Sequence, residues 1–445
     1  MPDSRTNTLA MDLCLRIGEM LLSNGAGAAD VTATMRSVAW QFGLRNPVVD
    51  VTFTSLSMGY QGADDDFPMT LLRQVVQRDI DYEDLTRVDH LVRDIIAGRL
   101  DLHEARTTIV RISSTGHHRN RWAVTASWGV MSAGVALMLG GSWVVMAIAS
   151  VSAVLIDRLQ LVMSRRRLPV FYQQIAGGAI ATLLAVAAAG LELAANPSLV
   201  VTANIIMLLS GIGFMGALQD CLSGFYVTGG ARIIEALLAT AGIIAGVSGG
   251  LAVGELLGVE VGRLQPGAWR LETVGVMALG AGICAAAFAF AAYSPKRVLA
   301  PIALIAGAAM VIAHTIEQNV LGRTWSVGLA ALFIGLVSYT AAGRVRVPPL
   351  VVVVSAIVPL LPGLSIYRGL SLLTEGGQSA SGGILAMVTA ASIAIALASG
   401  VILGEYIAQP LKREARRLES RLSGPRLVGP PRLRPARRHR SADPS

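Results

Sequence analysis

The sequence predicts an α-helical polytopic membrane protein of about ten transmembrane helices in a 5+5 inverted repeat, with a small soluble α/β domain at its N-terminus. Composition is the first reason: 53% of the 445 residues are hydrophobic and only 15% are charged, whereas a soluble domain is typically about 25% charged. The uneven placement of the charged residues is the second reason. The third is a pair of glycine-containing helix interruptions at corresponding places in the two halves of the chain.

Composition divides the chain into four segments. Residues 1–121 carry an ordinary mixture of charged and polar groups and form the expected cytoplasmic soluble domain. Residues 122–257 and 258–408 are nearly uncharged and supply the first and second five-helix halves. Residues 409–445 form a basic tail, expected to be disordered, whose eleven bases and three acids account for the net charge of +8. A basic segment after a transmembrane helix is typical of a cytoplasmic segment touching anionic lipid, so the high pI does not indicate nucleic-acid binding.

Hydrophobic periodicity predicts mixed structure in the first segment. Apolar residues recur at helical spacing and stop at glycine or Asn-Gly, while one stretch alternates apolar and polar residues as a half-buried strand does. Asp101 and Glu104 have the spacing of a capping box that opens a short helix. The residues 64–66, three consecutive aspartates, are expected in a loop. The predicted helices cover residues 9–21, 31–42 and 82–95, and the predicted strand covers residues 49–54.

Enzymatic chemistry is not indicated in the soluble domain. The residues that could serve a hydrolase have none of the spacings of a nucleophile elbow, a P-loop or a zinc protease; they are Ser23, Ser55, Ser57, His90 and His103. The three cysteines share no metal-ligand spacing, so neither a metal nor another cofactor is expected. A regulatory or gating domain is therefore favoured over a membrane-anchored hydrolase, which stays the alternative from another functional class.

Ten stretches are long and apolar enough to be read as membrane spans of about 20 residues. They are Trp122–Gly140, Ser142–Met163, Phe171–Leu191, Leu199–Leu218, Ile233–Val253, Thr273–Tyr293, Val298–His314, Trp325–Ala342, Pro348–Leu364 and Gly382–Ala408. With the N-terminus inside, nine arginines and lysines fall in inside loops and four in outside loops, as the positive-inside rule requires. We therefore expect a bacterial plasma (inner) membrane protein with both termini in the cytoplasm.

The fourth and ninth expected spans are interrupted at corresponding points. Ser210, Gly211 and Gly213 interrupt the fourth, and Pro362 and Gly363 interrupt the ninth. A broken helix frees backbone N–H and C=O groups that lipid cannot satisfy, so such groups persist only inside protein or against a hydrated cavity. Paired interruptions in corresponding spans are typical of a transporter's solute site. The alternative is that these glycines merely allow helices to pack closely.

A small charged cluster follows the first interruption. Asp220, Arg232 and Glu235 stand near the ends of apolar stretches, and Arg232 and Glu235 are three residues apart, on one helical face. Ionisable residues within spans are candidates for function. We interpret the trio as an ion-coupling or gating cluster, with an ordinary interfacial salt bridge as the alternative.

The stretches that carry these features resemble the bacterial threonine/serine exporter family. The opening Gly18-Glu19-Met20-Leu21-Leu22-Ser23-Asn24-Gly25-Ala26, the middle stretch from Gln219-Asp220 to Arg232, and Leu361 to Leu370 are similar to that family. Ser210 departs from it, because the family pattern has Leu-Pro-Gly at such a break. The resemblance covers all but the tail and implies proton-driven export of threonine and serine, without a cofactor and without enzymatic activity.

The resemblance adds Ser365, Tyr367 and Arg368 to the candidate solute-binding residues, because they lie in the matching stretch after the second interruption. A related branch is linked to export of dicarboxylates such as succinate, which stays the alternative substrate. A zwitterion needs a partner for each charge, whereas a dicarboxylate favours a second base such as Arg368. The expected partners are thus a small polar solute, protons and anionic lipid; the sequence does not indicate an oligomeric state.

Overall fold

The structure is a computed structural model. It describes residues 4–419 apart from residues 63–67, 76–79, 117–118, 194–195, 209–210, 260–273, 320–321, 363–364, 367, 370–371 and 373–378. The expected aspartate loop at residues 64–66 and the tail beyond residue 419 lie outside the described residues.

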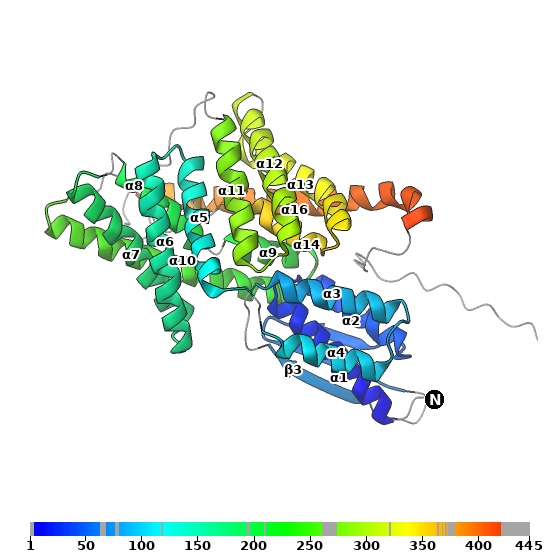
Figure 1. Cartoon of the computed structure of the whole chain (residues 1–445). Helices are drawn as coiled ribbons and strands as arrows, with labels where there is room; N and C mark the ends of the chain where they lie inside the picture. Colours follow the sequence, from blue (N-terminus) through cyan, green and yellow to red (C-terminus); the bar gives the residue numbers. More distant parts are fainter. Residues whose placement is uncertain are drawn as a thin grey trace, which may run out of the picture.

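Residues 4–114 form an N-terminal α/β unit, blue to cyan in Figure 1. Its three strands form an antiparallel sheet in the order β1-β2-β3, with Val49 opposite Met58 and Ser57 opposite Leu72. The helices α1, α2, α3 and α4 pack around one another, and α1 also contacts β2 and β3. The elements are α1 (Ser4–Ser23), α2 (Ala28–Gln41), β1 (Val48–Val51), β2 (Ser55–Tyr60), β3 (Met69–Gln74), α3 (Tyr82–Ile96) and α4 (Leu102–Ser114).

Local signals explain most of these elements. Residues such as Leu13 and Ile17 recur on one face of α1 and are fully buried, and Gly25 turns the chain between α1 and α2 with a φ of +90°. The capping box is confirmed: the Asp101 side chain accepts a hydrogen bond from the Glu104 amide, and the Glu104 side chain accepts one from the Asp101 amide. The strand predicted over residues 49–54 ends at Val51, and two strands that were not predicted, β2 and β3, complete an antiparallel sheet with it.

The remaining described chain is helical. Its elements are α5 (Arg121–Met138), α6 (Trp143–Arg165), α7 (Val170–Gly190), α8 (Pro197–Leu208), α9 (Gly211–Leu222), α10 (Tyr226–Leu256), α11 (Val274–Ala291), η2 (Lys296–Val298), α12 (Leu299–Asn319), α13 (Arg323–Val345), α14 (Pro349–Ile357), η3 (Val358–Leu360) and α16 (Ser379–Glu419). Figure 1 shows these helices above the N-terminal α/β unit, with α9 and α14 close to it.

Seven of the described helices are long and apolar enough to cross a membrane, and the bent pair α8 and α9 would make an eighth. They coincide with eight of the ten expected spans. The two other expected spans are helical as well, but α5 falls outside this set and Pro349–Leu360 is only a short apolar helix. The count of ten therefore stays a prediction.

Two series of helices contact one another in chain order. α5, α6, α7 and α8 contact in chain order, as α11, α12, α13 and α14 do, and the closest long pairings are α7 with α10 and α13 with α16. Glycines allow both close approaches. A Cβ added at Gly242 of α10 would lie 2.6 Å from the Phe171 carbonyl oxygen, and one at Gly335 of α13 would lie 2.5 Å from the Val401 oxygen. The pairs α7–α10 and α13–α16 thus both approach closely at glycines.

Candidate functional site

The first helix interruption is a bend between two short helices. α8 ends at Leu208, α9 begins at Gly211, and the axes of the two helices differ by 43°. Gly213, in the first turn of α9, is exposed. Ser210 lies outside the described residues. The predicted interruption of the fourth expected span is therefore present as a bend.

The second interruption has the same local plan. α14 begins at Pro349 and continues into η3, which ends at Leu360; Leu361 is then extended and Pro362 is buried. In the sequence, the spacing from Pro349 to Gly363 equals the spacing from Pro197 to Gly211. Pro197 is the first residue of α8. Gly363 itself lies outside the described residues. Each half thus has a short apolar helix that begins at a proline and ends just before the interruption.

The segments that follow the two interruptions pack in one cluster. Phe214 of α9 and Ile366 are both buried and belong to the same hydrophobic cluster, together with Ala236 of α10 and with Ala390 and Ala394 of α16. Phe214 follows Gly211 at the same distance in sequence as Ile366 follows Gly363. Phe214 and Ile366 therefore meet in a cluster that also contains residues of α10 and α16.

Some of the other predicted solute-binding residues are among those that the structure describes. Ser365 is half-buried next to Ile366, whereas Arg368 is exposed. Tyr367 lies outside the described residues. Gly369 packs against α16, because an added Cβ there would meet the Met387 side chain at 2.7 Å.

Two residues of the predicted charged trio pair with each other. Asp220 at the end of α9 and Arg232 on α10 form an ion pair of 2.8 Å, with their side chains 1% and 11% exposed. Glu235 lies one turn further along α10 at an exposed position. The pair also contacts the N-terminal α/β unit: Asp220 Oδ1 accepts a hydrogen bond of 2.9 Å from the Ala28 amide, and Arg232 Nη2 donates one of 3.4 Å to the Ala26 carbonyl. The predicted cluster is thus a buried pair at a contact between two parts of the chain.

Two further contacts hold the N-terminal α/β unit against the helices. The Thr228 hydroxyl of α10 donates a hydrogen bond of 3.1 Å to the Val51 carbonyl of β1. On α3, the Tyr82 amide donates one of 2.9 Å to the Ala292 carbonyl, and the Tyr82 ring packs edge-on against Phe288 at 6.4 Å. Burial raises the pKa of the Tyr82 phenol.

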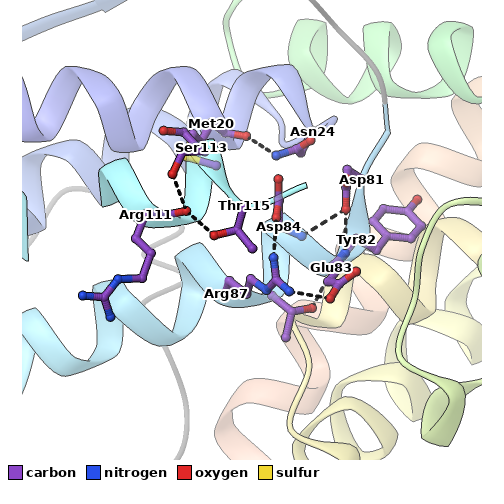
Figure 2. A network of polar contacts seen from close by, with 12 residues as sticks. Met20, Asn24, Asp81, Tyr82, Glu83, Asp84, Arg87, Arg111, Ser113 and Thr115 are labelled. Atoms are coloured by element: carbon purple, nitrogen blue, oxygen red, sulfur yellow. Dashed lines mark hydrogen bonds and ion pairs between the residues drawn. The ribbon is translucent and has the colours of Figure 1, made fainter. Parts of the chain in front are cut away.

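A polar network fixes the start of α3 beside Tyr82, as Figure 2 shows. The Asp81 side chain accepts hydrogen bonds from the Glu83 and Asp84 amides and so caps the helix. Arg87 pairs with Glu83 at 2.6 Å and with Asp84 at 3.3 Å. The Tyr82 side chain itself packs against Phe288 of α11.

The hydrolase candidates do not form a catalytic arrangement in the described part of the chain. The Ser23 hydroxyl donates to the Met20 carbonyl in its own helix, Ser55 contacts Thr52 beside β2, and the ring of His90 lies 3.3 Å from the Arg346 carbonyl. Among the described residues, no group of three or more possible metal ligands comes together.

The sequence reasoning missed the residues of the N-terminal α/β unit that contact Asp220 and Arg232. These are Ala26 and Ala28, at the turn into α2. Sequence patterns also gave no sign of the contacts of Val51 with Thr228 and of Tyr82 with Ala292. The run Gly25-Ala26-Gly27-Ala28 indicated that another part of the chain could approach the backbone closely here, because small residues leave room for it. The sequence around the run does not indicate which part of the chain that is.

Comparison with known proteins identifies the family. A family model described as "Putative threonine/serine exporter" matches residues 12–254, and one described as "Threonine/Serine exporter, ThrE" matches residues 277–407. The chain is 34% identical over 432 residues to the "Probable threonine/serine exporter" of Mycobacterium tuberculosis (strain ATCC 25618 / H37Rv), covering 96% of this chain and 81% of that protein. It is 32% identical over 414 residues to the "Threonine/serine exporter" of Corynebacterium glutamicum, covering 91% and 84%. No solved structure matches. With its set of long apolar helices, the chain is a multi-pass membrane protein and not an enzyme, and it belongs to the threonine/serine exporter family.

Proposed function

We propose that this protein exports threonine and serine across the plasma membrane of a bacterium. Two relatives that bear the name threonine/serine exporter align with more than nine tenths of the chain. The similarity spans both the N-terminal α/β unit and the helices and covers 81% and 84% of these two relatives.

The solute site of this proposal lies between the two helix interruptions. The observation that carries it is the cluster in which Phe214 and Ile366, at corresponding positions after Gly211 and Gly363, pack together. Interrupted helices offer unpaired backbone N–H and C=O groups, which bind the carboxylate and ammonium groups of a small zwitterion without buried ionised side chains. The proposed contacts of threonine or serine are Ser210, Gly211, Gly213, Pro362, Gly363, Ser365, Tyr367 and Arg368.

The proposed topology has ten spans in two inverted halves, residues 122–257 and 258–408. It is supported by the matching order of helix contacts and by the proline-to-glycine spacing that the two halves share. Two halves of five spans make ten in all, and an even number of spans places both termini on the same side of the membrane. Arginine and lysine are more frequent in the loops on that side, which places it in the cytoplasm. Residues 1–121 and 409–445 then form a cytoplasmic domain and a cytoplasmic tail, with the tail beside anionic lipid.

The proposed driving force is the proton gradient, and the Asp220–Arg232 pair is the proposed gate. A carboxylate that is 1% exposed and bound to a single cation gains or loses a proton only together with a rearrangement of its partner. Asp220 therefore joins proton binding to movement of α9 and α10. Glu235, one turn further along α10, is the third residue of this proposed cluster.

The experiment that tests the function is counterflow in proteoliposomes with labelled threonine and labelled serine. We expect uptake of both against an unlabelled amino acid trapped inside, and no competition from succinate. Uptake of labelled succinate in place of threonine would establish the dicarboxylate alternative. An imposed pH gradient should accelerate threonine flux, and an unchanged rate under that gradient would remove the proton from the proposal.

A further inference from the structure

One helix connects the proposed solute site to the N-terminal α/β unit. α9 begins at Gly211, places Phe214 in the cluster between the interruptions, and ends beyond Asp220, where the N-terminal α/β unit contacts it. Less than two helical turns separate Phe214 from Asp220, so the helix is too short to absorb a displacement at one end by bending. Whatever fixes Asp220 in space also fixes the residues that follow the first interruption.

Asp220 acts as the N-terminal cap of α2, although 192 residues separate it from Ala28. The residue at the cap position of α2 is Gly27, which has no side chain to accept a hydrogen bond. The first amides of a helix lack partners inside the helix and carry a partial positive charge, so they attract a carboxylate. Asp220 supplies that carboxylate from the membrane helices, and Arg232 balances its charge at 2.8 Å.

The contact leaves little room for displacement. A Cβ added at Gly27 would lie 3.3 Å from Asp220 Oδ1, and a Cβ added at Gly216 of α9 would lie 3.4 Å from Arg232 Nη1. Nearby, the buried Thr228 hydroxyl binds the Val51 carbonyl. Four segments that are remote in sequence therefore meet at one place: the turn before α2, the end of β1, the end of α9 and the start of α10.

We infer that the N-terminal α/β unit is a positioning element for transport: by holding Asp220 and Arg232 through the backbone of residues 26–28, it sets the position of α9 and of the first helix interruption. Asp220, Arg232 and Gly27 are positioning residues that act on the solute through α9. This inference rests on the proposed function in one respect, the location of the solute site beside α9. The rival explanation is that the contact only stabilises the folded chain.

Thermodynamic linkage separates these explanations. If docking of the N-terminal α/β unit favours solute binding, bound solute must favour docking by the same factor. A contact that only stabilises the fold changes the amount of folded protein but leaves the KM for the solute unchanged. The first readout is therefore the KM for threonine. The second is the exposure of a buried interface residue, measured with and without threonine.

The test uses full-length protein in which Cys14, Cys221 and Cys284 are replaced by alanine. Thr228→Cys, buried against β1 and first shown to transport, reports docking through its rate of reaction with a soluble maleimide. We expect saturating threonine to slow this reaction by about five-fold or more, the lower end of common coupling factors. A rate that threonine leaves unchanged would overturn the inference.

The variant on the other side of the contact is Gly27→Val. It adds bulk against Asp220 without changing α9 or α10, and its backbone, with a φ of −68° and a ψ of 150°, suits any residue. We expect faster labelling of Thr228→Cys and a several-fold higher KM for threonine in the folded fraction. Faster labelling with an unchanged KM would overturn the inference.

Two further variants complete the design. Ser223→Ala, near the same end of α9, removes only a local hydrogen bond to the Gln219 carbonyl and should leave labelling and KM unchanged. If Gly27→Val does not fold, Gly27→Ala makes the smaller version of the same change. If wild-type protein moves neither threonine nor serine, the proposed function fails. If it moves them and threonine does not affect labelling, only the positioning inference fails.

Discussion

Replacing Gly211 by alanine tests the helix interruption directly. Gly211 is the first residue of α9, just after the bend of 43° from α8. Alanine is favoured over glycine in a helix by about 1 kcal/mol, so the substitution favours a helix that continues through the bend. A bias of 1 kcal/mol changes the ratio of two conformations about five-fold. We therefore expect normal abundance and stability, with threonine flux per folded molecule reduced by up to about five-fold.

Two other glycines provide matched controls. Gly249 of α10 is exposed, and an added Cβ there would meet no atom within 4 Å, so Gly249→Ala should leave flux unchanged. Gly335 of α13 lies against α16, where an added Cβ would be 2.5 Å from the Val401 oxygen and 3.1 Å from the Gly404 Cα. Overpacking of this kind costs about 1–3 kcal/mol, which outweighs the helix propensity gained. Gly335→Ala should thus lower thermal stability while flux per folded molecule is preserved.

The assay is threonine counterflow in proteoliposomes, divided by the amount of folded protein measured from monodisperse material in detergent. Gly363→Ala should behave as Gly211→Ala does, since the two positions correspond in the two halves. Preserved flux per folded molecule in both variants would refute the reasoning, because it would make these glycines packing residues of the same kind as Gly335.

The remaining predictions concern stability and topology. Arg232→Gln leaves the carboxylate of Asp220, which is 1% exposed, without its cation and should cost about 3–5 kcal/mol; adding Asp220→Asn should recover part of this loss in a thermal-unfolding cycle, and additive losses would argue against a coupled pair. Burial raises the pKa of Tyr82, so the neutral phenol stabilises the fold and this contribution should be lost as the pH rises above the unfolded pKa of about 10. Tyr82→Phe should abolish that alkaline loss of melting temperature, and an identical loss in the variant would assign it to other groups. A reporter fused after Ser445 should respond as cytoplasmic and one inserted in residues 259–270 as external; the same response from both would exclude ten spans.

Local patterns were sufficient where neighbours in sequence decide the structure. The helical spacing of apolar residues predicted α1, α2 and α3, and the Asp101–Glu104 spacing predicted the capping box of α4. The sheet was predicted only in part. β3 is at most half-buried on either face, so its alternation of apolar and polar residues is weak, and its pairing with β2 is a contact that no local pattern contains.

The helix interruptions show the same division. Glycine and proline act on the backbone of their own residue and its neighbours, so the sequence indicated where α8 and α14 end. It could not indicate that Phe214 and Ile366, one after each interruption, meet in one cluster. That meeting depends on the packing of α9 against α10 and against α16, which only the whole arrangement of helices establishes.

The sequence by itself determined the class of the protein: the scarcity of charge requires a membrane, the periodicity requires helices, and the stretches shared with the threonine/serine exporters mark the family. The tertiary structure alone decided what Asp220 and Arg232 contact. As a pattern, the two residues and Glu235 resemble an ion-coupling trio on neighbouring helices; in the folded chain two of them bind each other and the backbone of residues 26–28. The physical reason is that a backbone amide or carbonyl is present at every residue, so the partner of a charged side chain leaves no mark in the sequence when that partner is backbone.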